Sequence, residues 1–240
     1  MSLPVAILAG GKATRLGPIA ARMPKSLVEV AGRPFAEHQI ALLARHGLTD
    51  IVFLAGHLGT TLRDALGDGA RWGVALRYAF DGARPLGTGG AIRAALSILG
   101  ERFFVLYGDS YLECEYERIE QSFLESGCAG LMTVYRNDGR WDRSNVQFDG
   151  RRILAYDKRV QEPQEASMRH IDYGLGLLTR SAFEAYPEHE PFDLATVYQD
   201  LLARGDLAAY EVSTRFYEIG SPAGLQEADA YLASKGTTAR

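Results

Sequence analysis

The chain has few cysteines and no long apolar run. Of its 240 residues only Cys114 and Cys128 are cysteines, too few for the disulfide framework of a small secreted domain. No stretch reaches the roughly 18 apolar residues that a membrane-spanning helix needs. The N-terminus lacks the basic segment and apolar core that mark a signal peptide. These absences predict a cytoplasmic protein with no membrane partner.

An excess of positive charge is also missing. Lysine and arginine number 26 against 30 aspartates and glutamates, which gives a net charge of −4. Neutralising a nucleic-acid backbone requires a basic surface, so we expect no nucleic-acid partner and only a local anion site. The apolar fraction of 47% and the charged fraction of 23% are typical of a globular protein.

Several motifs of covalent and metal catalysis are absent. There is no G-x-S-x-G nucleophile turn, no cysteine–histidine signature and no cysteine cluster for zinc. His38 and His46 lie eight residues apart on one predicted helix, a poor spacing for a shared metal. We expect both histidines to be core or rim residues.

Short apolar runs alternate with helical patterns in the first half of the chain. Consecutive apolar residues predict buried strands at 4–9, 50–56 and 103–110, and alternation predicts another strand at 74–81. Helical patterns lie between the strands at 35–47, 58–69 and 89–100. This order predicts the α/β class with a Rossmann-like, doubly wound, mostly parallel sheet.

The second half is richer in strands. We expect these to add antiparallel strands to the sheet edge, at 130–136, 144–148, 151–159 and 171–179. A helix closed by Gly205 follows at 192–205, then two extended segments at 208–214 and 216–221. The last helix begins with Ser221 as N-cap and Pro222 in its first position. We expect a single domain over 1–234 and a disordered tail over 235–240.

A glycine-rich loop follows the first predicted strand. Gly10 and Gly11 lack the later glycines of the dinucleotide motif G-x-G-x-x-G, and Ala13 replaces the Ser or Thr of a P-loop. What remains is a loop with four cations, Lys12, Arg15, Arg22 and Lys25. Glycines let backbone N–H groups converge on an anion. The alternative is a solvated basic loop, but its place after a strand end favours a ligand site.

The motif LAGGKATRL (8–16), followed by MPKSLVEVAGRPF (23–35), resembles the signature of sugar-1-phosphate nucleotidylyltransferases. The resemblance continues in family order over nearly the whole chain, through PLGTGGAI (85–92), LYGDS (106–110), YDKR (156–159), IDYGLGLL (171–178) and FYEIGSP (216–222). Within the family the chain is similar to short bacterial enzymes such as heptose-1-phosphate guanylyltransferases.

The resemblance implies transfer of a nucleoside monophosphate from a nucleoside triphosphate to a sugar 1-phosphate. Pyrophosphate leaves, an NDP-sugar forms, and Mg²⁺ is the cofactor. GTP and a heptose or hexose 1-phosphate are favoured, while UTP, CTP and dTTP stay open, as does the oligomeric state. The halves 1–134 and 135–234 are then expected to bind the nucleotide and the sugar phosphate, respectively.

The resemblance also assigns roles around the triphosphate. Arg15 is expected to grip the leaving pyrophosphate, Lys25 to lie between the α-phosphate and the sugar phosphate, and Asp109 to act in catalysis. The residues implied to contact the nucleotide are Leu8, Ala9, Gly10, Gly11, Ala13, Thr14, Arg15, Lys25, Leu86, Gly87, Thr88 and Gly108. Ala13 stands where relatives have glycine, so we predict a negative φ there. Thr88 has the alternative role of capping its own helix.

Asp109 and Glu218 are the implied metal ligands. Mg²⁺ prefers one or two carboxylates, with phosphates and waters completing its octahedron. Asp109 follows an apolar strand, where it is expected beside the glycine loop, although Gly-Asp-Ser also forms turns. Glu218 replaces the aspartate of relatives, which favours monodentate or water-mediated ligation.

For the sugar phosphate, the resemblance points to Asn145, Asp157, Lys158 and Asp172. Lys158 is expected to neutralise the phosphate and Asp157 to bind a hydroxyl. Asn145 replaces a glycine of relatives, and Asp172 stands where many have asparagine, so the sugar stays undetermined. Each of these residues has the alternative of an ordinary surface position on a strand.

Two other functions stay open. The departures at Ala13, Asn145 and Glu218 are compatible with a catalytically silent nucleotide-sugar sensor or regulatory subunit. A cytidylyltransferase acting on a non-sugar phosphate is the second alternative.

Overall fold

The computed structural model describes residues 2–11, 23–56, 58–82, 84–159 and 167–237. The chain divides into two compact units that interleave along the sequence. The first unit comprises residues 1–85, 106–112 and 216–240, and the second comprises 86–105 and 113–215. The two units are defined by the contacts within each of them. The expected halves 1–134 and 135–234 are defined by the ligand that each binds, and that division stays a prediction.

Three parallel strands form the sheet of the first unit. They are hydrogen-bonded in the order β1–β4–β5 and span Val5–Leu8, Asp50–Ala55 and Ala75–Phe80. Val5 faces Ile51, and the side chains from Ile51 to Ala55 are buried. The uninterrupted apolar runs at β1 and β4 are explained by this burial, because a parallel strand covered on both faces has no polar side.

Helices and short strands complete the first unit. They are η2 (Lys25–Leu27), β2 (Glu29–Val30), β3 (Arg33–Pro34), α1 (Phe35–Arg45), α2 (Gly59–Leu66), η3 (Ala70–Trp72), β7 (Ser110–Tyr111), β13 (Tyr217–Glu218) and α6 (Pro222–Thr237). Helix α1 ends as the sequence predicts, because Gly47 adopts a φ of +73°. Helix α6 continues to Thr237, three residues past the expected end of the domain at 234.

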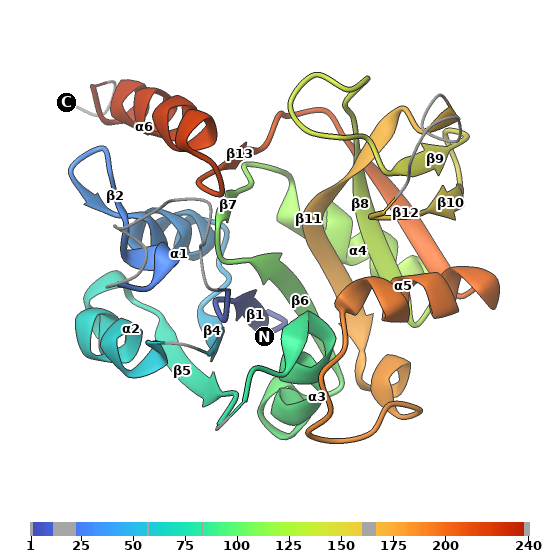
Figure 1. The fold of residues 1–240 in the computed structure, drawn as a ribbon, viewed down its shortest axis with the longest axis horizontal. Coiled ribbons are helices and arrows are strands. Elements are labelled where there is room, and N and C mark those ends of the chain that lie inside the picture. Colours follow the sequence, from blue (N-terminus) through green and yellow to red (C-terminus); the bar gives the residue numbers. More distant parts are fainter. Residues whose placement is uncertain (1, 12–22, 57, 83, 160–166, 238–240) are drawn as a thin grey trace. The chain divides into compact units, whose positions relative to one another are not determined.

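The two ends of the chain share a core in the first unit. Figure 1 shows α6, drawn in red, beside the blue elements β2 and α1. The core between them contains Val28, Val30, Phe35, Leu42, Tyr111, Ile219, Ala228 and Leu232. Strand β13 pairs antiparallel with β7, so that Glu218 faces Ser110. The C-terminal segment is thereby fixed next to the turn that contains Asp109.

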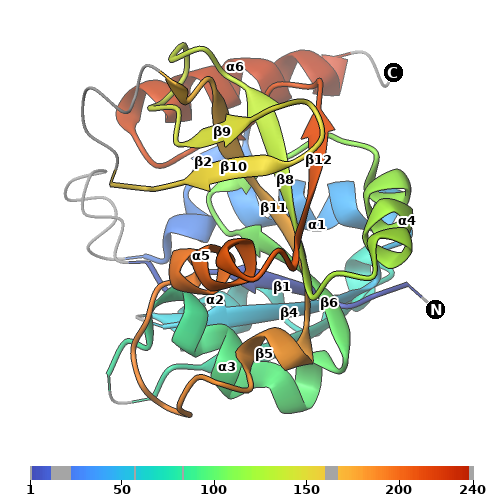
Figure 2. The ribbon, with the colours of Figure 1, turned by 90° about the vertical axis from the view of Figure 1, so that its right-hand side faces the viewer.

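Five strands of the second unit are hydrogen-bonded in the order β10–β9–β11–β8–β12 (Figure 2). They span Ile153–Tyr156, Val146–Phe148, His170–Thr179, Gly130–Arg136 and Leu207–Val212. The pairs β10–β9, β9–β11 and β11–β8 are antiparallel, which confirms the predicted antiparallel additions. The pair β8–β12 is parallel. The described strands therefore form a mixed α/β architecture with parallel and antiparallel parts.

The helices of the second unit are α3 (Gly87–Leu99), α4 (Tyr116–Ser126), η5 (Arg180–Phe183) and α5 (Leu194–Ala203). Strand β6 (Arg102–Tyr107) begins in this unit, and its last two residues belong to the first. The sequence analysis missed α4, although Tyr116, Ile119 and Phe123 are buried at helical spacing. No helix in the described ranges is both long and apolar enough to cross a membrane.

The buried face of α4 provides a test of this packing. Phe123 is 2% exposed whereas its neighbour Leu124 is 49% exposed. Replacing Phe123 by alanine removes buried apolar surface and leaves a cavity, so we expect a loss of about 3–5 kcal/mol in unfolding free energy. Leu124→Ala is the matched control and is expected to change it by less than about 1 kcal/mol. Urea unfolding followed by circular dichroism measures both, and similar losses in the two variants would contradict this packing.

Candidate functional site

A tight turn after β6 brings Asp109 next to the start of the glycine loop. The Gly108 backbone N–H donates to the Leu8 carbonyl at 3.0 Å. A Cβ atom at residue 108 would lie 2.7 Å from that carbonyl oxygen, which is closer than any real side chain allows. Only glycine permits this approach. The expected place of Asp109, at a strand end beside Leu8 and Ala9, agrees with this geometry.

Lys25 and Asp109 form an ion pair in the first unit. Lys25 Nζ lies 2.6 Å from Asp109 Oδ2, and the two side chains are 14% and 32% exposed. Lys25 begins the short helix η2, directly after Pro24 with its φ of −56°. Proline restricts the backbone at this point. A charge-assisted hydrogen bond of this length orients both groups.

Glu218 lies beside the same ion pair. The Ile219 N–H donates to the Asp109 carbonyl at 2.9 Å, which joins the two segments. The Glu218 carboxylate accepts hydrogen bonds from the Gly220 N–H and from Ser221 Oγ. A Cβ at residue 220 would collide with the Glu218 carboxylate and lie 3.1 Å from Lys25 Nζ. A second carboxylate therefore lies near the Lys25 ammonium group, which is paired with Asp109.

Ser221 has a second role in this segment. Its Oγ accepts a hydrogen bond from the Gly224 N–H at 3.0 Å, which satisfies a free donor in the first turn of α6. The predicted N-cap is thus confirmed. The same hydroxyl donates to Glu218 at 2.7 Å, so the helix start holds the carboxylate in place.

The donor set at this turn fits Mg²⁺. Asp109 and Glu218 offer carboxylate oxygens, which are the ligands that this hard cation prefers. Within the described residues no group of three or more histidine, cysteine, aspartate or glutamate side chains is arranged to hold a metal. The protein would thus supply two carboxylates and leave positions for phosphates and waters. Both oxygens of Glu218 already accept hydrogen bonds, and each retains a lone pair for a further partner.

The first residues of the glycine loop are held by the strand ends of the first unit. The Ala9 N–H donates to the Leu54 carbonyl at 2.9 Å, and Gly10 lies against the backbone of Gly56. Among the described residues, no atom would lie within 4 Å of a Cβ atom at Gly11. The remaining loop residues of the predicted site, Ala13, Thr14 and Arg15, lie outside the described residues, as does the predicted φ of Ala13.

Thr88 does not cap its own helix. Helix α3 begins at Gly87, and its N-cap is Leu86, without a side-chain hydrogen bond. The Thr88 hydroxyl instead accepts from the Leu194 N–H at 2.8 Å and donates to Asp193. It therefore supports the start of α5, which lies 106 residues later. The capping alternative was wrong because the hydroxyl has a tertiary partner.

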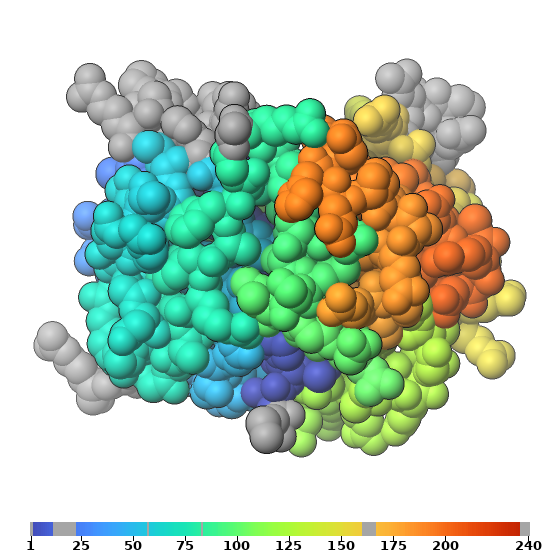
Figure 3. Space-filling view, turned by 90° about the horizontal axis from the view of Figure 1, so that it is seen from below, coloured from blue at the N-terminus to red at the C-terminus, as the bar shows by residue number. Residues whose placement is uncertain are grey.

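The glycines at the start of α3 are required for packing. In Figure 3 the orange surface of the segment near residue 190 lies against the green surface of α3. A Cβ at Gly89 would collide with the Phe192 ring, and one at Gly90 would lie 2.5 Å from the Glu190 carbonyl. Close packing against residues 190–192 therefore explains why Gly89 and Gly90 are glycines. The expected contact of this segment with a nucleobase stays a prediction.

The residues predicted for the sugar phosphate cluster in the second unit. Asn145 Oδ1 accepts from the Asp172 N–H at 2.9 Å, and the Asn145 carbonyl accepts from the Asp157 N–H at 3.0 Å. The Tyr156 hydroxyl donates to Asp172 Oδ2 at 3.1 Å. Asn145 thus connects the backbones of both predicted acids, through its side-chain amide oxygen and its backbone carbonyl.

Asp193 joins this cluster and was missed by the sequence analysis. It caps α5 by accepting from the Ala195 N–H at 2.8 Å, and Lys158 Nζ lies 3.4 Å from the same carboxylate. Burial alone raises the pKa of Asp193, but its hydrogen bond with Ala195 and the charge of Lys158 outweigh burial and hold the pKa below its usual value. An aspartate before a helical pattern is a capping signal that could have identified it.

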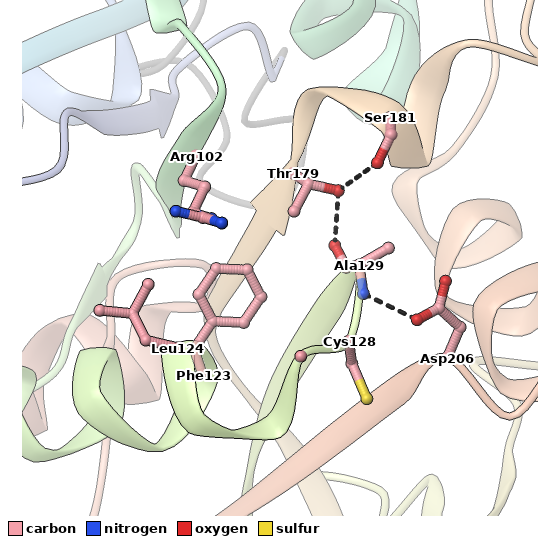
Figure 4. Close-up of a pocket in the computed structure, with 9 residues that line it drawn as sticks. Arg102, Phe123, Leu124, Cys128, Ala129, Thr179, Ser181 and Asp206 are labelled. Atoms are coloured by element: carbon pink, nitrogen blue, oxygen red, sulfur yellow. Dashed lines mark hydrogen bonds between the residues drawn. The ribbon is translucent and has the colours of Figure 1, made fainter.

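Two cavities lie away from the predicted residues. Figure 4 shows one of about 270 Å³ in the second unit, where Arg102 and Asp206 stand on opposite sides and Phe123 and Leu124 lie nearby. The other, about 560 Å³, is in the first unit and is lined by Ala31, Arg33, His38, Ala41, Arg45, Tyr111, Leu232, Ala233 and Lys235. None of the residues predicted for nucleotide, sugar phosphate or metal lines either cavity.

Comparisons with known proteins agree with the motifs. A family model described as nucleotidyl transferase matches residues 5–144. The low-salt glycan biosynthesis nucleotidyltransferase Agl11 of Haloferax volcanii is 29% identical, and the match covers 96% of this chain and 68% of that protein. The N-acetylmuramate alpha-1-phosphate uridylyltransferase of Neisseria meningitidis is 27% identical, over 93% of this chain and 96% of that protein.

Among solved structures, one named as a glucose-1-phosphate thymidylyltransferase from Bacillus anthracis superposes with a TM-score of 0.84. It is 22% identical, and the match covers 97% of this chain and 96% of that one. At this identity the likeness shows a shared fold.

The carboxyl of Asp172 predicts a pH effect. Burial raises the pKa of Asp172 above its usual 3.8 and outweighs the opposing charge of Lys158. The folded protein thus binds this proton more tightly than the unfolded chain does. The contribution of Asp172 to stability therefore falls as the pH rises from 3.8 through the folded-state pKa.

Asp172→Asn removes this titration. We expect the unfolding free energy of the variant, relative to that of the native protein, to increase with pH across that window and to be constant below and above it. Urea unfolding at a series of pH values measures the difference. A difference that does not change with pH would contradict the raised pKa.

Proposed function

Because this chain belongs to the nucleotidyl transferase family, we propose that it is a sugar-1-phosphate nucleotidylyltransferase. A phosphate oxygen of the sugar 1-phosphate attacks the α-phosphorus of a nucleoside triphosphate. The bond from that phosphorus to the β-phosphate oxygen breaks, and pyrophosphate leaves. The observation that carries the proposal is the Lys25–Asp109 ion pair beside Glu218, where β6 ends next to the glycine loop.

Lys25 provides the cation that this reaction needs. Both reactants are anions, so much of the barrier arises from bringing their charges together. Lys25 Nζ is largely buried and held at 2.6 Å from a carboxylate, which keeps a positive charge at a fixed point. When a triphosphate binds, this ammonium can donate to phosphate oxygens as well. Arg15 is proposed to bind the leaving pyrophosphate as a bidentate donor.

Asp109 and Glu218 are proposed to hold Mg²⁺. A bound Mg²⁺ neutralises phosphate charge during the transfer. Asp109 is fixed by its turn, and Glu218 by Gly220 and Ser221, so that the carboxylates are oriented before a ligand arrives. The longer side chain of Glu218, in place of the family's aspartate, is accommodated because Gly220 leaves room for it.

Backbone groups are proposed to bind the nucleotide. In the first unit the contacts come from Leu8, Ala9, Gly10, Gly11, Ala13, Thr14 and Gly108, and in the second from Leu86, Gly87 and Thr88. Glycine-rich backbone presents N–H groups to phosphates without obstruction by side chains. Contacts of this kind with a base leave GTP, UTP, dTTP and CTP all to be tested.

The connected polar cluster of the second unit is proposed to bind the sugar phosphate. Lys158 carries the positive charge, and its ion pair with Asp193 is half exposed, so a phosphate can compete for it. Asp157, Asp172 and Asn145 supply acceptors and an amide for sugar hydroxyls. Asn145 fixes the backbones of Asp157 and Asp172, and the Asp172 carboxylate accepts from the Tyr156 hydroxyl and the Gly174 N–H.

The decisive test is pyrophosphate release measured over a matrix of four nucleoside triphosphates and several sugar 1-phosphates. We expect one productive pair with the native protein. Lys25→Ala and Asp109→Asn should each lower kcat by about 100-fold or more, since a single charged contact in such a site has that effect. Asp50→Asn is the matched control, because the Asp50–Arg77 ion pair is of similar length and lies elsewhere on the sheet of the first unit.

Other results would overturn the proposal. Near-normal turnover of Lys25→Ala and Asp109→Asn would show that the site is assigned wrongly. Binding of a triphosphate without any product would favour a regulatory protein. A product formed only from CTP and a non-sugar phosphate would favour a cytidylyltransferase that does not act on sugars.

Removal of metal gives a separate test of the two carboxylates. We expect EDTA to abolish pyrophosphate release and Mg²⁺ to restore it. In Glu218→Gln the Mg²⁺ concentration for half-maximal rate should rise about tenfold, because a charged oxygen donor is lost. Glu37→Gln, which removes the charge of the Glu37–Arg71 pair, should leave the Mg²⁺ concentration for half-maximal rate unchanged. An unaltered Mg²⁺ requirement in Glu218→Gln would rule out Glu218 as a ligand.

A further inference from the structure

All four backbone carbonyls of the turn that contains Asp109 accept hydrogen bonds. Gln39 Nε2 donates to the Tyr107 carbonyl at 3.1 Å and to the Ser110 carbonyl at 2.8 Å. Ser26 Oγ donates to the Gly108 carbonyl at 3.3 Å, and the Ile219 N–H donates to that of Asp109 at 2.9 Å. The turn is therefore held at every peptide group, although the turn itself supplies none of these donors.

Gln39 spans the turn from one end to the other. It lies on α1, and its side chain is 1% exposed. Because carbonyl oxygens only accept, the amide must present its nitrogen to both of them, and the two hydrogens of that nitrogen satisfy the two carbonyls. The Gln39 Oε1 atom is buried and has no hydrogen-bond partner among the described residues. The side chain of Gln39 is therefore held through the two hydrogen bonds that its amide nitrogen donates, and its Oε1 atom has no hydrogen bond to any described residue.

Ser26 connects the segment that contains Lys25 to the turn that contains Asp109. It follows Lys25 directly in η2 and is 2% exposed. Its hydrogen bond to Gly108 ties the backbone next to the ammonium group to the backbone next to the carboxylate. Through Ser26 and Gln39, the two partners of the Lys25–Asp109 pair are fixed to one another and to α1.

We propose that Gln39 and Ser26 are positioning residues that set the Asp109 carboxylate relative to Lys25 and the metal. The inference rests on the proposed function, since it assigns these residues to the same reaction. The hydrogen bonds of both side chains go to backbone carbonyls of the turn, so each residue acts through the backbone. A rigid turn keeps the carboxylate in its binding geometry before substrate arrives, which is a condition for fast transfer.

The alternative is that Gln39 and Ser26 only stabilise the fold. Two variants separate the two roles. Gln39→Met keeps the length of the side chain and removes both donors, while Ser26→Ala removes one hydroxyl. Thr133→Val is the matched control, because Thr133 is a fully buried residue whose hydroxyl also donates to a backbone carbonyl, that of Leu175, outside the turn.

With the productive substrate pair, we expect kcat to fall by about 10- to 100-fold in Gln39→Met, the effect of a small misplacement of a reacting group. The fall should be smaller in Ser26→Ala. In both variants the Mg²⁺ concentration for half-maximal rate should rise several-fold while KM for the triphosphate changes less than twofold. Thr133→Val should lower the urea midpoint and leave kcat and the Mg²⁺ requirement unchanged.

A native kcat and Mg²⁺ requirement in both variants would overturn the inference, as would a loss of stability alone, like that of Thr133→Val. If Gln39→Met does not fold, Ser26→Ala decides by the same criteria.

If the native protein releases no pyrophosphate from any pair, the proposed function fails. Mn²⁺ affinity, measured by electron paramagnetic resonance, then tests the positioning separately. Several-fold weaker binding in the variants supports it, and equal or undetectable binding overturns it.

Discussion

The ion pair between Lys25 and Asp109 is the interaction on which the rest of the site depends. Its two residues are 84 positions apart, and they meet at 2.6 Å because β6 ends beside β1. The Gly108 contact with Leu8 allows this approach, and Pro24 restricts the backbone that leads to Lys25. The C-terminal segment then adds Glu218, through the pairing of β13 with β7. Three separate stretches of the chain thus converge on one pair of charges.

Glycines in this protein serve two different purposes. Gly108 and Gly220 leave space where the backbone or a carboxylate approaches closely, next to the charged groups. Gly89 and Gly90 leave space for residues 190–193, which pack on the start of α3. In the sequence both kinds appear as glycine-rich turns before or after a regular element. Only the neighbours that fill the space distinguish them, and those neighbours are distant along the chain.

Much of the fold could be predicted from the sequence because local patterns specify it. The uninterrupted apolar runs of β1 and β4 and the glycine that closes α1 lead directly to the observed elements. The start of α5 was predicted at residue 192, but Asp193 caps it and the helix begins at Leu194. Helix α4 was missed although its buried residues have helical spacing. Most residues of α4 are polar, so the helix is recognised only from the three- and four-residue spacing of its apolar residues.

The site was predictable only in part. The motifs identified Lys25, Asp109 and Glu218, but not the hydrogen bonds from Gln39 and Ser26 that hold their turn. Capping of its own helix was the alternative role for Thr88, whereas its hydroxyl accepts a hydrogen bond at the start of α5. In each case the missing information is a tertiary partner more than 60 residues away. A hydrogen bond across such a separation has no local signal in the sequence.

The most direct test of the account is a crystal structure of the protein with a non-hydrolysable nucleoside triphosphate and Mn²⁺, located by its anomalous scattering. The account predicts Mn²⁺ bound by the Asp109 carboxylate, at a metal–oxygen distance of about 2.0–2.2 Å. Lys25 Nζ is predicted within hydrogen-bond distance of a phosphate oxygen. Mn²⁺ and triphosphate bound elsewhere, with the Lys25–Asp109 pair unchanged, would contradict the account.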